Sequence, residues 1–312
     1  TRCARQRSRP EWMGLGDNPA PAVCAHQIDP TMSDTAAPAP SVPASAIAFI
    51  GGGNMASALI GGLLAQGMAP TQIEVVEPSE AARSSLLAQF GITAQALPGP
   101  QLRAADLVVW AVKPQVFREA ALQARPLTSA ALHLSVAAGI RSSSIAQWLG
   151  TERVVRAMPN TPALIGRGMS ALFARKAVDA LERKRVEQLM APTGEMLWVE
   201  EEPLLDAVTA LSGSGPAYVF YFLEAMTRAG TSMGLSEAQA HQLAVGTFAG
   251  AAELARQSDE APAVLRQRVT SKGGTTHAAI ESMEHAGVAD ALVQAIEAAQ
   301  QRAHELGDEF GT

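Results

Sequence analysis

Hydrophobic and polar positions follow different patterns in the two halves of the chain. From Ala46 to about Glu201, short apolar runs rich in β-branched residues are separated by stretches of helical periodicity. Strands are expected at residues 46–50, 73–76, 107–112, 132–136 and 153–157. Alternation of strands and helices is typical of a parallel sheet wound with helices, so residues 46–201 are expected to form a doubly wound α/β domain.

Residues 202–312 lack strand signals and have helical periodicity almost throughout. Ser236 and Gln239 form a capping box that opens a long helix, apolar on more than one face, in which Gly246 and Gly250 permit close helix contact. One small domain cannot cover such a helix. The segment therefore predicts an all-α dimerisation domain and an obligate homodimer, with burial inside a single chain as the alternative.

The first 45 residues differ from the rest of the chain. They combine early arginines with a Pro/Ala/Ser-rich run and have no hydrophobic periodicity, so we expect a disordered tail over residues 1–45. Met32 precedes the first strand by a short linker and is a candidate start, with an arginine-rich transit peptide as the alternative. Cys3 and Cys24 both fall in this tail, which argues against a disulfide framework or a thiolate metal site in the folded part.

Composition limits the class of protein further. The 312 residues exceed one ordinary core, and 47% hydrophobic with 17% charged residues is the balance of a well-buried globular chain. The net charge of −6 disfavours nucleic acid as a partner, and the six scattered histidines lack metal-ligand spacing. No apolar run approaches the ~20 residues that span a membrane. We expect a cytoplasmic two-domain enzyme that binds no metal, nucleic acid or membrane.

A glycine-rich turn follows the first expected strand and precedes an amphipathic helix. Its sequence is Gly51-x-Gly53-x-x-Ala56. Gly51 allows a tight turn, Gly53 lets the backbone approach a pyrophosphate, and the phosphates would lie at the helix N-terminus. This context predicts a dinucleotide site that includes Asn54 and Met55, whereas a strand–helix turn without a nucleotide is the alternative reading.

Residues just beyond the carboxyl ends of the strands complete the candidate cofactor site, because ligands of such sheets bind at that edge. Glu77 ends the second strand, where a carboxylate accepts hydrogen bonds from a ribose 2′-OH and repels a 2′-phosphate. This favours NADH, although Ser79 and Arg83 would serve NADPH if Glu77 turned away. The other candidates at this edge are Ala111, Val112, Lys113, Pro114, Ala137, Ala138, Gly139 and Asn160.

A second pair of glycines stands far along the chain, before another expected helix. The run is Ser271-Lys272-Gly273-Gly274-Thr275-Thr276. Adjacent glycines let main-chain N–H groups approach a ligand, and the hydroxyl groups beside them add further donors. The run predicts a cradle for a small carboxylate, whereas a Ser/Gly/Thr turn that merely caps a helix is the alternative.

Several of these motifs together resemble the Δ1-pyrroline-5-carboxylate reductase family. The run from Pro262 to Glu284 is similar to the family signature without a gap, and the resemblance extends from Ile47 to about Gln301. Other matching runs are IGGGNM at 50–55, AVKP at 111–114, RAMPNTP at 156–162 and SGSGPAY at 212–218. The resemblance implies a Rossmann-type domain followed by a helical dimerisation domain, with the active site where they meet.

The resemblance also implies a reaction and a set of site residues. The reaction is reduction of the cyclic imine 1-pyrroline-5-carboxylate to L-proline with NADPH or NADH, in a homodimer or a larger assembly of dimers. The implied substrate-binding residues are Ser271, Gly273, Gly274, Thr275 and Thr276, with the Thr276 hydroxyl on the ring nitrogen. The alternatives are another imine or β-hydroxy acid reductase of this architecture, or a non-catalytic dinucleotide-binding protein.

Lys113 is a second candidate for a catalytic role, beside Thr276. The chain has only four lysines, and two of them, Lys113 and Lys272, fall inside the proposed site motifs. A lysine at the mouth of the sheet would lend positive potential to the cofactor and to the substrate carboxylate. The alternative is a solvated loop residue that ends a strand before Pro114.

Overall fold

The computed structural model describes residues 46–311. The expectations made for residues 1–45, namely a disordered tail, a start at Met32 and both cysteines, lie outside the described residues.

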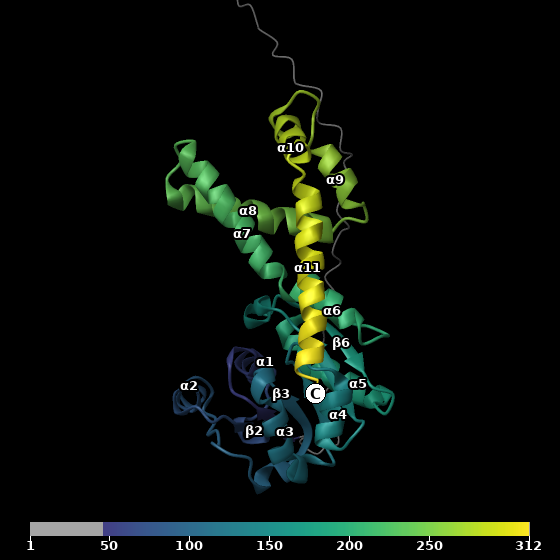
Figure 1. Cartoon of the computed structure of the whole chain (residues 1–312). Helices are drawn as coiled ribbons and strands as arrows, with labels where there is room; N and C mark the ends of the chain where they lie inside the picture. The colour runs from purple at the N-terminus through teal and green to yellow at the C-terminus, as the bar shows by residue number, and fades with distance from the viewer. Residues whose placement is uncertain (1–45, 312) are drawn as a thin grey trace, which may run out of the picture. The chain divides into compact units, whose positions relative to one another are not determined.

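A seven-stranded sheet forms the first part of the described chain (Figure 1). Its strand order is β2-β1-β3-β4-β5-β6-β7, and every neighbouring pair is parallel except β5 and β6. The strands are β1 (Ala46–Ile50), β2 (Ile73–Val76), β3 (Ala105–Trp110), β4 (Leu132–Ser135), β5 (Val154–Met158), β6 (Gly168–Ala174) and β7 (Gly194–Trp198).

Helices cover both faces of this sheet. They are α1 (Asn54–Ala65), α2 (Glu80–Phe90), α3 (Pro114–Thr128), α4 (Ser142–Leu149) and α5 (Ala180–Met190). Because successive strand residues point to opposite faces, Phe49 packs with α1, α2 and α5 in one cluster and Ile50 packs with α3 and α4 in another. Short 3-10 turns occupy Pro70–Gln72, Pro100–Ala104, Thr161–Ile165 and Ala191–Thr193.

The doubly wound fold predicted from the sequence is confirmed. The sheet is parallel apart from β6, which runs antiparallel to β5 and then pairs with β7 in parallel. Strands β6 and β7 were not anticipated individually. The burial of β6 is nearly continuous and β7 alternates only between half-buried and exposed positions, so neither has the clean pattern of a half-buried strand.

The rest of the chain is helical, as expected. The helices are α6 (Leu204–Val208), a π-turn at Thr209–Gly213, α7 (Gly215–Ser232), α8 (Glu237–Arg256), α9 (Pro262–Arg268), α10 (Thr275–His285) and α11 (Val288–Glu309). The predicted capping box of α8 is present, since Ser236 Oγ accepts from Gln239 N (3.3 Å) and Gln239 Oε1 accepts from Ser236 N (3.0 Å). Within residues 46–311, each helix is too short or too polar to span a membrane.

Helix α8 remains largely uncovered in one chain. It lies beside α7 (Figure 1), yet only Ala240 and Ala244 of α8 are buried. Leu243 and Leu254 expose 59% and 58% of their surface. Burial of this helix inside a single chain, the alternative considered from the sequence, is therefore wrong.

A buried ion pair joins the sheet to the first residues of the helical part. Arg156 on β5 donates to Glu202 at 2.7 Å, and Ser142 at the start of α4 donates to the same carboxylate through its amide and hydroxyl. Burial alone would raise the pKa of Glu202, but the Arg156 charge and the Ser142 bonds lower it. The carboxylate therefore stays ionised where the two domains connect.

His133 makes the stability of the fold depend on pH. It lies on β4 at 1% exposure, and its Nδ1 accepts a hydrogen bond from Trp110 Nε1 at 3.1 Å. Burial lowers its pKa from 6.5 to about 4. Between these values the folded state binds fewer protons than the unfolded state, so the stability contributed by neutral His133 is complete above pH 6.5 and is lost as pH falls to about 4.

We therefore expect the free energy of unfolding to fall by about 3 kcal/mol more in the wild type than in His133→Gln as the solution is acidified across this window. The glutamine amide oxygen still accepts from Trp110 but does not titrate. Urea unfolding from pH ~7 to ~4 measures the difference. Equal losses in both proteins would contradict the prediction.

Candidate active site

The glycine-rich turn between β1 and α1 has the geometry of a phosphate-binding loop. Gly51 has φ +98°, and a Cβ there would lie 2.5 Å from the Ala111 carbonyl oxygen, so only glycine fits. A Cβ on Gly53, the residue preceding α1, would meet nothing within 4 Å. Ala56 is fully buried against the sheet. The turn thus opens a space in front of the free amides of α1, where a pyrophosphate fits.

Glu77 is held toward this turn rather than away from it. Its two carboxylate oxygens accept from Gly52 N (2.8 Å) and Ser79 N (2.7 Å). Ser79 Oγ also accepts from Ala82 N and caps α2, a role that serine favours at a helix N-terminus. Arg83 Nη1 donates to the carbonyl oxygens of Glu77 (2.9 Å) and Pro78 (2.6 Å). The Glu77 carboxylate and the Arg83 guanidinium therefore both lie at the end of β2, where the ribose of a dinucleotide would bind.

A cavity of about 480 Å³ lies at the carboxyl ends of β1, β2 and β3. Of the predicted cofactor residues it is lined by Gly51, Gly53, Glu77, Ser79, Ala111, Val112 and Lys113. The cavity is also lined by residues that were not predicted from the sequence, including Ala96, Leu97, Val116, Ala120 and Gln123. These side chains carry no motif, and helical periodicity places Val116, Ala120 and Gln123 along one face of α3.

The other predicted cofactor residues lie outside this cavity. Asn54, Met55 and Pro114 occupy the first turns of α1 and α3. Ala137, Ala138 and Gly139 form the loop that leaves β4, at the same edge of the sheet as the ends of β1 and β3. This loop contains a left-handed residue, Gly139, at φ +70°.

The Asn160 side chain makes hydrogen bonds to other residues of the protein. Its Nδ2 donates to the carbonyl oxygen and the hydroxyl of Ser212, both at 3.2 Å, and its Oδ1 accepts from Met169 N at 3.0 Å. These bonds connect the segment after β5 to the π-helical turn between α6 and α7. The Asn160 side chain therefore shapes the domain junction, and its assignment to the cofactor site stays a prediction.

The second glycine pair forms the loop before α10. Gly273 has φ +73°, which favours glycine, and a Cβ on Gly274 would lie 2.6 Å from Ser271 Oγ, so the Ser271 side chain folds over Gly274. Gly274 is the N-cap residue and makes no side-chain cap bond, which leaves the first amides of α10 open. Within residues 46–311 no hydrogen bond engages the Thr276 hydroxyl, so it does not serve as a helix cap.

Among residues 46–311, hydrogen bonds and ion pairs within one chain do not join the glycine-rich turn before α1 to the loop before α10. No hydrogen bond or ion pair joins residues 261–286 to residues 46–200 in the described part of the chain; Arg266, for example, pairs with Glu284. Helix α11 follows α10, and its 22 residues extend about 33 Å to a C-terminus that contacts the sheet domain. Ser271 and Thr275 are exposed, and Thr276 is half-buried.

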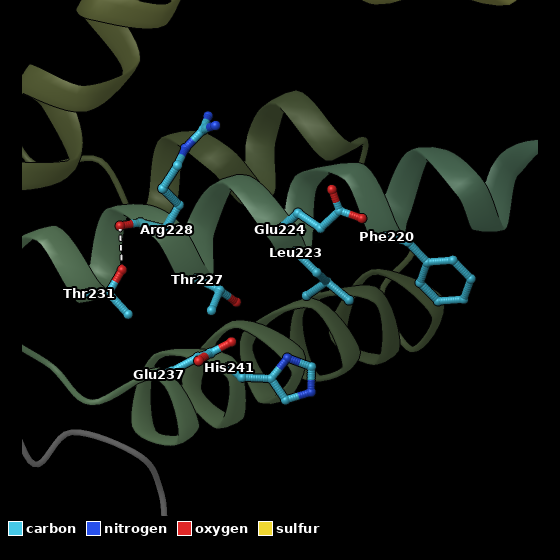
Figure 2. Close-up of a pocket in the computed structure, with 8 residues that line it drawn as sticks. All are labelled: Phe220, Leu223, Glu224, Thr227, Arg228, Thr231, Glu237 and His241. Carbon is cyan, nitrogen blue, oxygen red and sulfur yellow. Dashed lines mark hydrogen bonds between the residues drawn. The ribbon is translucent and has the colours of Figure 1, made fainter.

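A separate groove lies between α7 and α8 and contains none of the predicted site residues. This α7–α8 groove has a volume of about 520 Å³ and is lined by Phe220, Leu223, Glu224, Thr227, Arg228, Thr231, Glu237 and His241 (Figure 2). Phe220 is 57% exposed. The groove belongs to the uncovered surface of the helical part rather than to the reaction site.

The glycine turn, the acidic end of β2 and the cavity between them define a dinucleotide-binding protein of the Rossmann class. Two family models match separate parts of the chain. Residues 46–139 match an NADP oxidoreductase, coenzyme F420-dependent, and residues 202–306 match pyrroline-5-carboxylate reductase dimerisation. The chain belongs to the pyrroline-5-carboxylate reductase family.

Individual relatives agree with this assignment. The chain is 45% identical to a pyrroline-5-carboxylate reductase of Pseudomonas aeruginosa, covering 85% of this chain and 98% of that one, and 37% identical to the enzyme of Pisum sativum, covering 83% and 95%. A solved reductase from Coxiella burnetii superposes with a TM-score of 0.78 at 37% identity, covering 84% and 98%. A Plasmodium falciparum pyrroline carboxylate reductase with NADP bound gives 0.76 at 28% identity, covering 84% and 98%.

Proposed function

We propose that this protein reduces 1-pyrroline-5-carboxylate to L-proline, with NADH or NADPH as the hydride donor. The observation that carries the proposal is a dinucleotide cavity at the sheet edge combined with an open Ser/Gly/Thr loop at the start of α10, in a chain of this family. Incubation with 1-pyrroline-5-carboxylate should yield one proline per nicotinamide oxidised. Nicotinamide oxidation without proline would contradict the proposal.

The chain's own residues position the reactants. The free amides at the start of α10 and the Ser271 hydroxyl hold the substrate carboxylate, with Gly273 and Gly274 allowing its approach. The Thr276 hydroxyl holds the ring nitrogen, where electron density accumulates as hydride reaches the adjacent carbon. Bound nicotinamide supplies that hydride. Lys113, exposed at the cavity mouth, adds positive potential for both anionic reactants.

We further propose that two copies of the chain complete each site in a homodimer. The α10 loop makes no bond to the sheet domain of its own chain, while α7 and α8 leave apolar side chains such as Phe220, Tyr221 and Leu243 uncovered. A second copy that covers these helices would bring its α10 loop to the dinucleotide cavity. A larger assembly of dimers and a cytoplasmic location complete the proposal.

Mixed dimers test the shared site. Gly53→Val projects a side chain into the phosphate space, where a Cβ meets nothing within 4 Å, and Thr276→Ala removes the hydroxyl at the other loop. The mixed dimer has one Gly53→Val copy and one Thr276→Ala copy. If each site combines the cavity of one copy with the loop of the other, one site receives both changes and the other site is intact, so the purified mixed dimer should regain about half of wild-type activity. Activity equal to the mean of the two parent variants would contradict the shared site.

Glu77 predicts the choice of cofactor. Its carboxylate at the ribose position repels a 2′-phosphate, so NADH should be used at least as well as NADPH. Glu77→Ser removes that repulsion and leaves Arg83 in place, and it should shift kcat/KM toward NADPH. Arg83→Gln in the Glu77→Ser background is the matched control and should reverse the shift. A wild-type preference for NADPH of about tenfold or more, on the order of 1.4 kcal/mol, would refute the prediction.

A further inference from the structure

The last turn of α11 packs into the loop that joins β4 to α4. Arg141, the residue before α4, donates to Asp308 at 2.8 Å, and its guanidinium lies against Gly307, where a Cβ would be 3.1 Å from Nη2. Ser144 Oγ donates to the Gly311 carbonyl oxygen at 2.7 Å. A helix of the dimerisation domain therefore ends on a loop of the dinucleotide domain.

The backbone at Gly139 approaches α11 closely. Gly139 has φ +70°, and a Cβ there would lie 3.0 Å from Leu306 Cβ and 3.7 Å from Phe310 Cδ2. Phe310 packs against the hydrophobic cluster beneath α3 and α4. Any side chain at Gly139 would separate the loop from the helix. The loop conformation and the position of the last turn of α11 therefore depend on each other.

A third element supports the same turn. His304 on α11 lies 3.5 Å from Asp206 of α6 and 3.4 Å from the Arg141 guanidinium. Asp206 is buried, whereas Asp308 is exposed, and its hydrogen bond from Arg141 is the main reason that the pKa of Asp308 is lowered. Arg141 is thus the side chain that bridges the loop to α11.

We infer that Arg141 is a positioning residue: its pairing with Asp308 holds the Ala137–Gly139 loop in the conformation that receives the dinucleotide. The inference rests on the proposed function and on the prediction from the sequence that this loop contributes to the cofactor site. An isolated ion pair with one exposed partner contributes little by itself. Here it adds to the Ser144–Gly311 hydrogen bond and to the packing of Phe310, which hold the same helix end, so its loss loosens the turn against the loop.

Dinucleotide binding should in turn stabilise the last turn of α11, an effect that is not expected if the contact only stabilises the fold. If the last turn of α11 favours the binding conformation of the loop, dinucleotide binding must favour the docked turn to the same extent. NADH should therefore slow hydrogen exchange of amides in residues 303–311 of the wild type, although these amides belong to the dimerisation domain.

The experiment measures NADH and NADPH dissociation constants by fluorescence titration of the full-length protein without imine. Asp308→Ala and Arg141→Ala should each raise the dissociation constants about 3- to 30-fold, the double variant should add little more, and Arg141→Lys should recover part of the affinity. Exchange protection of residues 303–311 by NADH should disappear in Asp308→Ala. Glu309→Gln is the matched control, because it breaks an ion pair to Arg302 on the same turn without touching the loop.

Unchanged dissociation constants and unchanged NADH-dependent protection in Asp308→Ala, even with a lower Tm, would overturn the inference and leave a contact that only stabilises the fold. The titration needs no turnover, so it is distinct from the test of the proposed function. A wild type that binds NADH but forms no proline would contradict the proposed reaction alone.

Discussion

Replacement of Thr276 by alanine should lower kcat/KM for 1-pyrroline-5-carboxylate about 10- to 100-fold or more, because a hydrogen bond to a charged or charging nitrogen contributes about 1.5–3 kcal/mol. The Thr276 side chain is half-buried at the start of α10, and its hydroxyl makes no hydrogen bond within residues 46–311. Removing it should therefore leave the fold, the assembly and nucleotide binding almost unchanged. Steady-state kinetics with saturating cofactor measures the loss.

Thr276→Ser keeps the hydroxyl and should retain most of the activity. Thr270→Ala is a second control, since the Thr270 hydroxyl bonds only to the Arg266 carbonyl oxygen and stands before the loop. If Thr276→Ala had the kcat/KM of the wild type, the imine would have to bind somewhere other than at the start of α10.

Replacement of Gly246 by leucine should break the homodimer and, with it, activity. A Cβ at this position meets nothing within 4 Å in one chain, and leucine favours helix over glycine, so the variant chain has no internal reason to unfold. Overpacking a close helix contact costs about 1–3 kcal/mol for each copy, so dimer dissociation should rise ~30-fold or more when both copies carry the change. Sedimentation over a concentration series measures it.

Ala88→Leu is the matched control for this experiment, because it adds similar bulk at an exposed position of α2, outside the helical part. Its dimer should remain intact. A wild-type chain that is a compact, active monomer at low concentration would contradict the dimer itself, whatever Gly246→Leu does.

Features set by local sequence were predictable. The Gly51–Gly53 turn, the Ser79 cap and the Ser236 capping box each depend on residues a few positions apart, and the structure has all three. The cofactor cavity was found in part because strand ends can be recognised individually and parallel topology brings them to one edge.

Features set by distant pairing were not predictable. Arg141 and Asp308 are 167 residues apart, and neither belongs to a motif. Asn160 stands beside a strand end like a ligand, but the Ser212 and Met169 bonds that occupy it come from elements whose positions the sequence does not specify. The antiparallel β6 depends on a choice of strand partner rather than on its own composition.

Hydride transfer from the cofactor to the C=N carbon can be followed with a reduced nicotinamide dinucleotide deuterated at its reactive C4 position. Turnover of 1-pyrroline-5-carboxylate should give L-proline with one deuterium at C5, detected by mass spectrometry and NMR. Proline without deuterium at C5, or reduction of ketones in place of the imine, would contradict the proposed reaction.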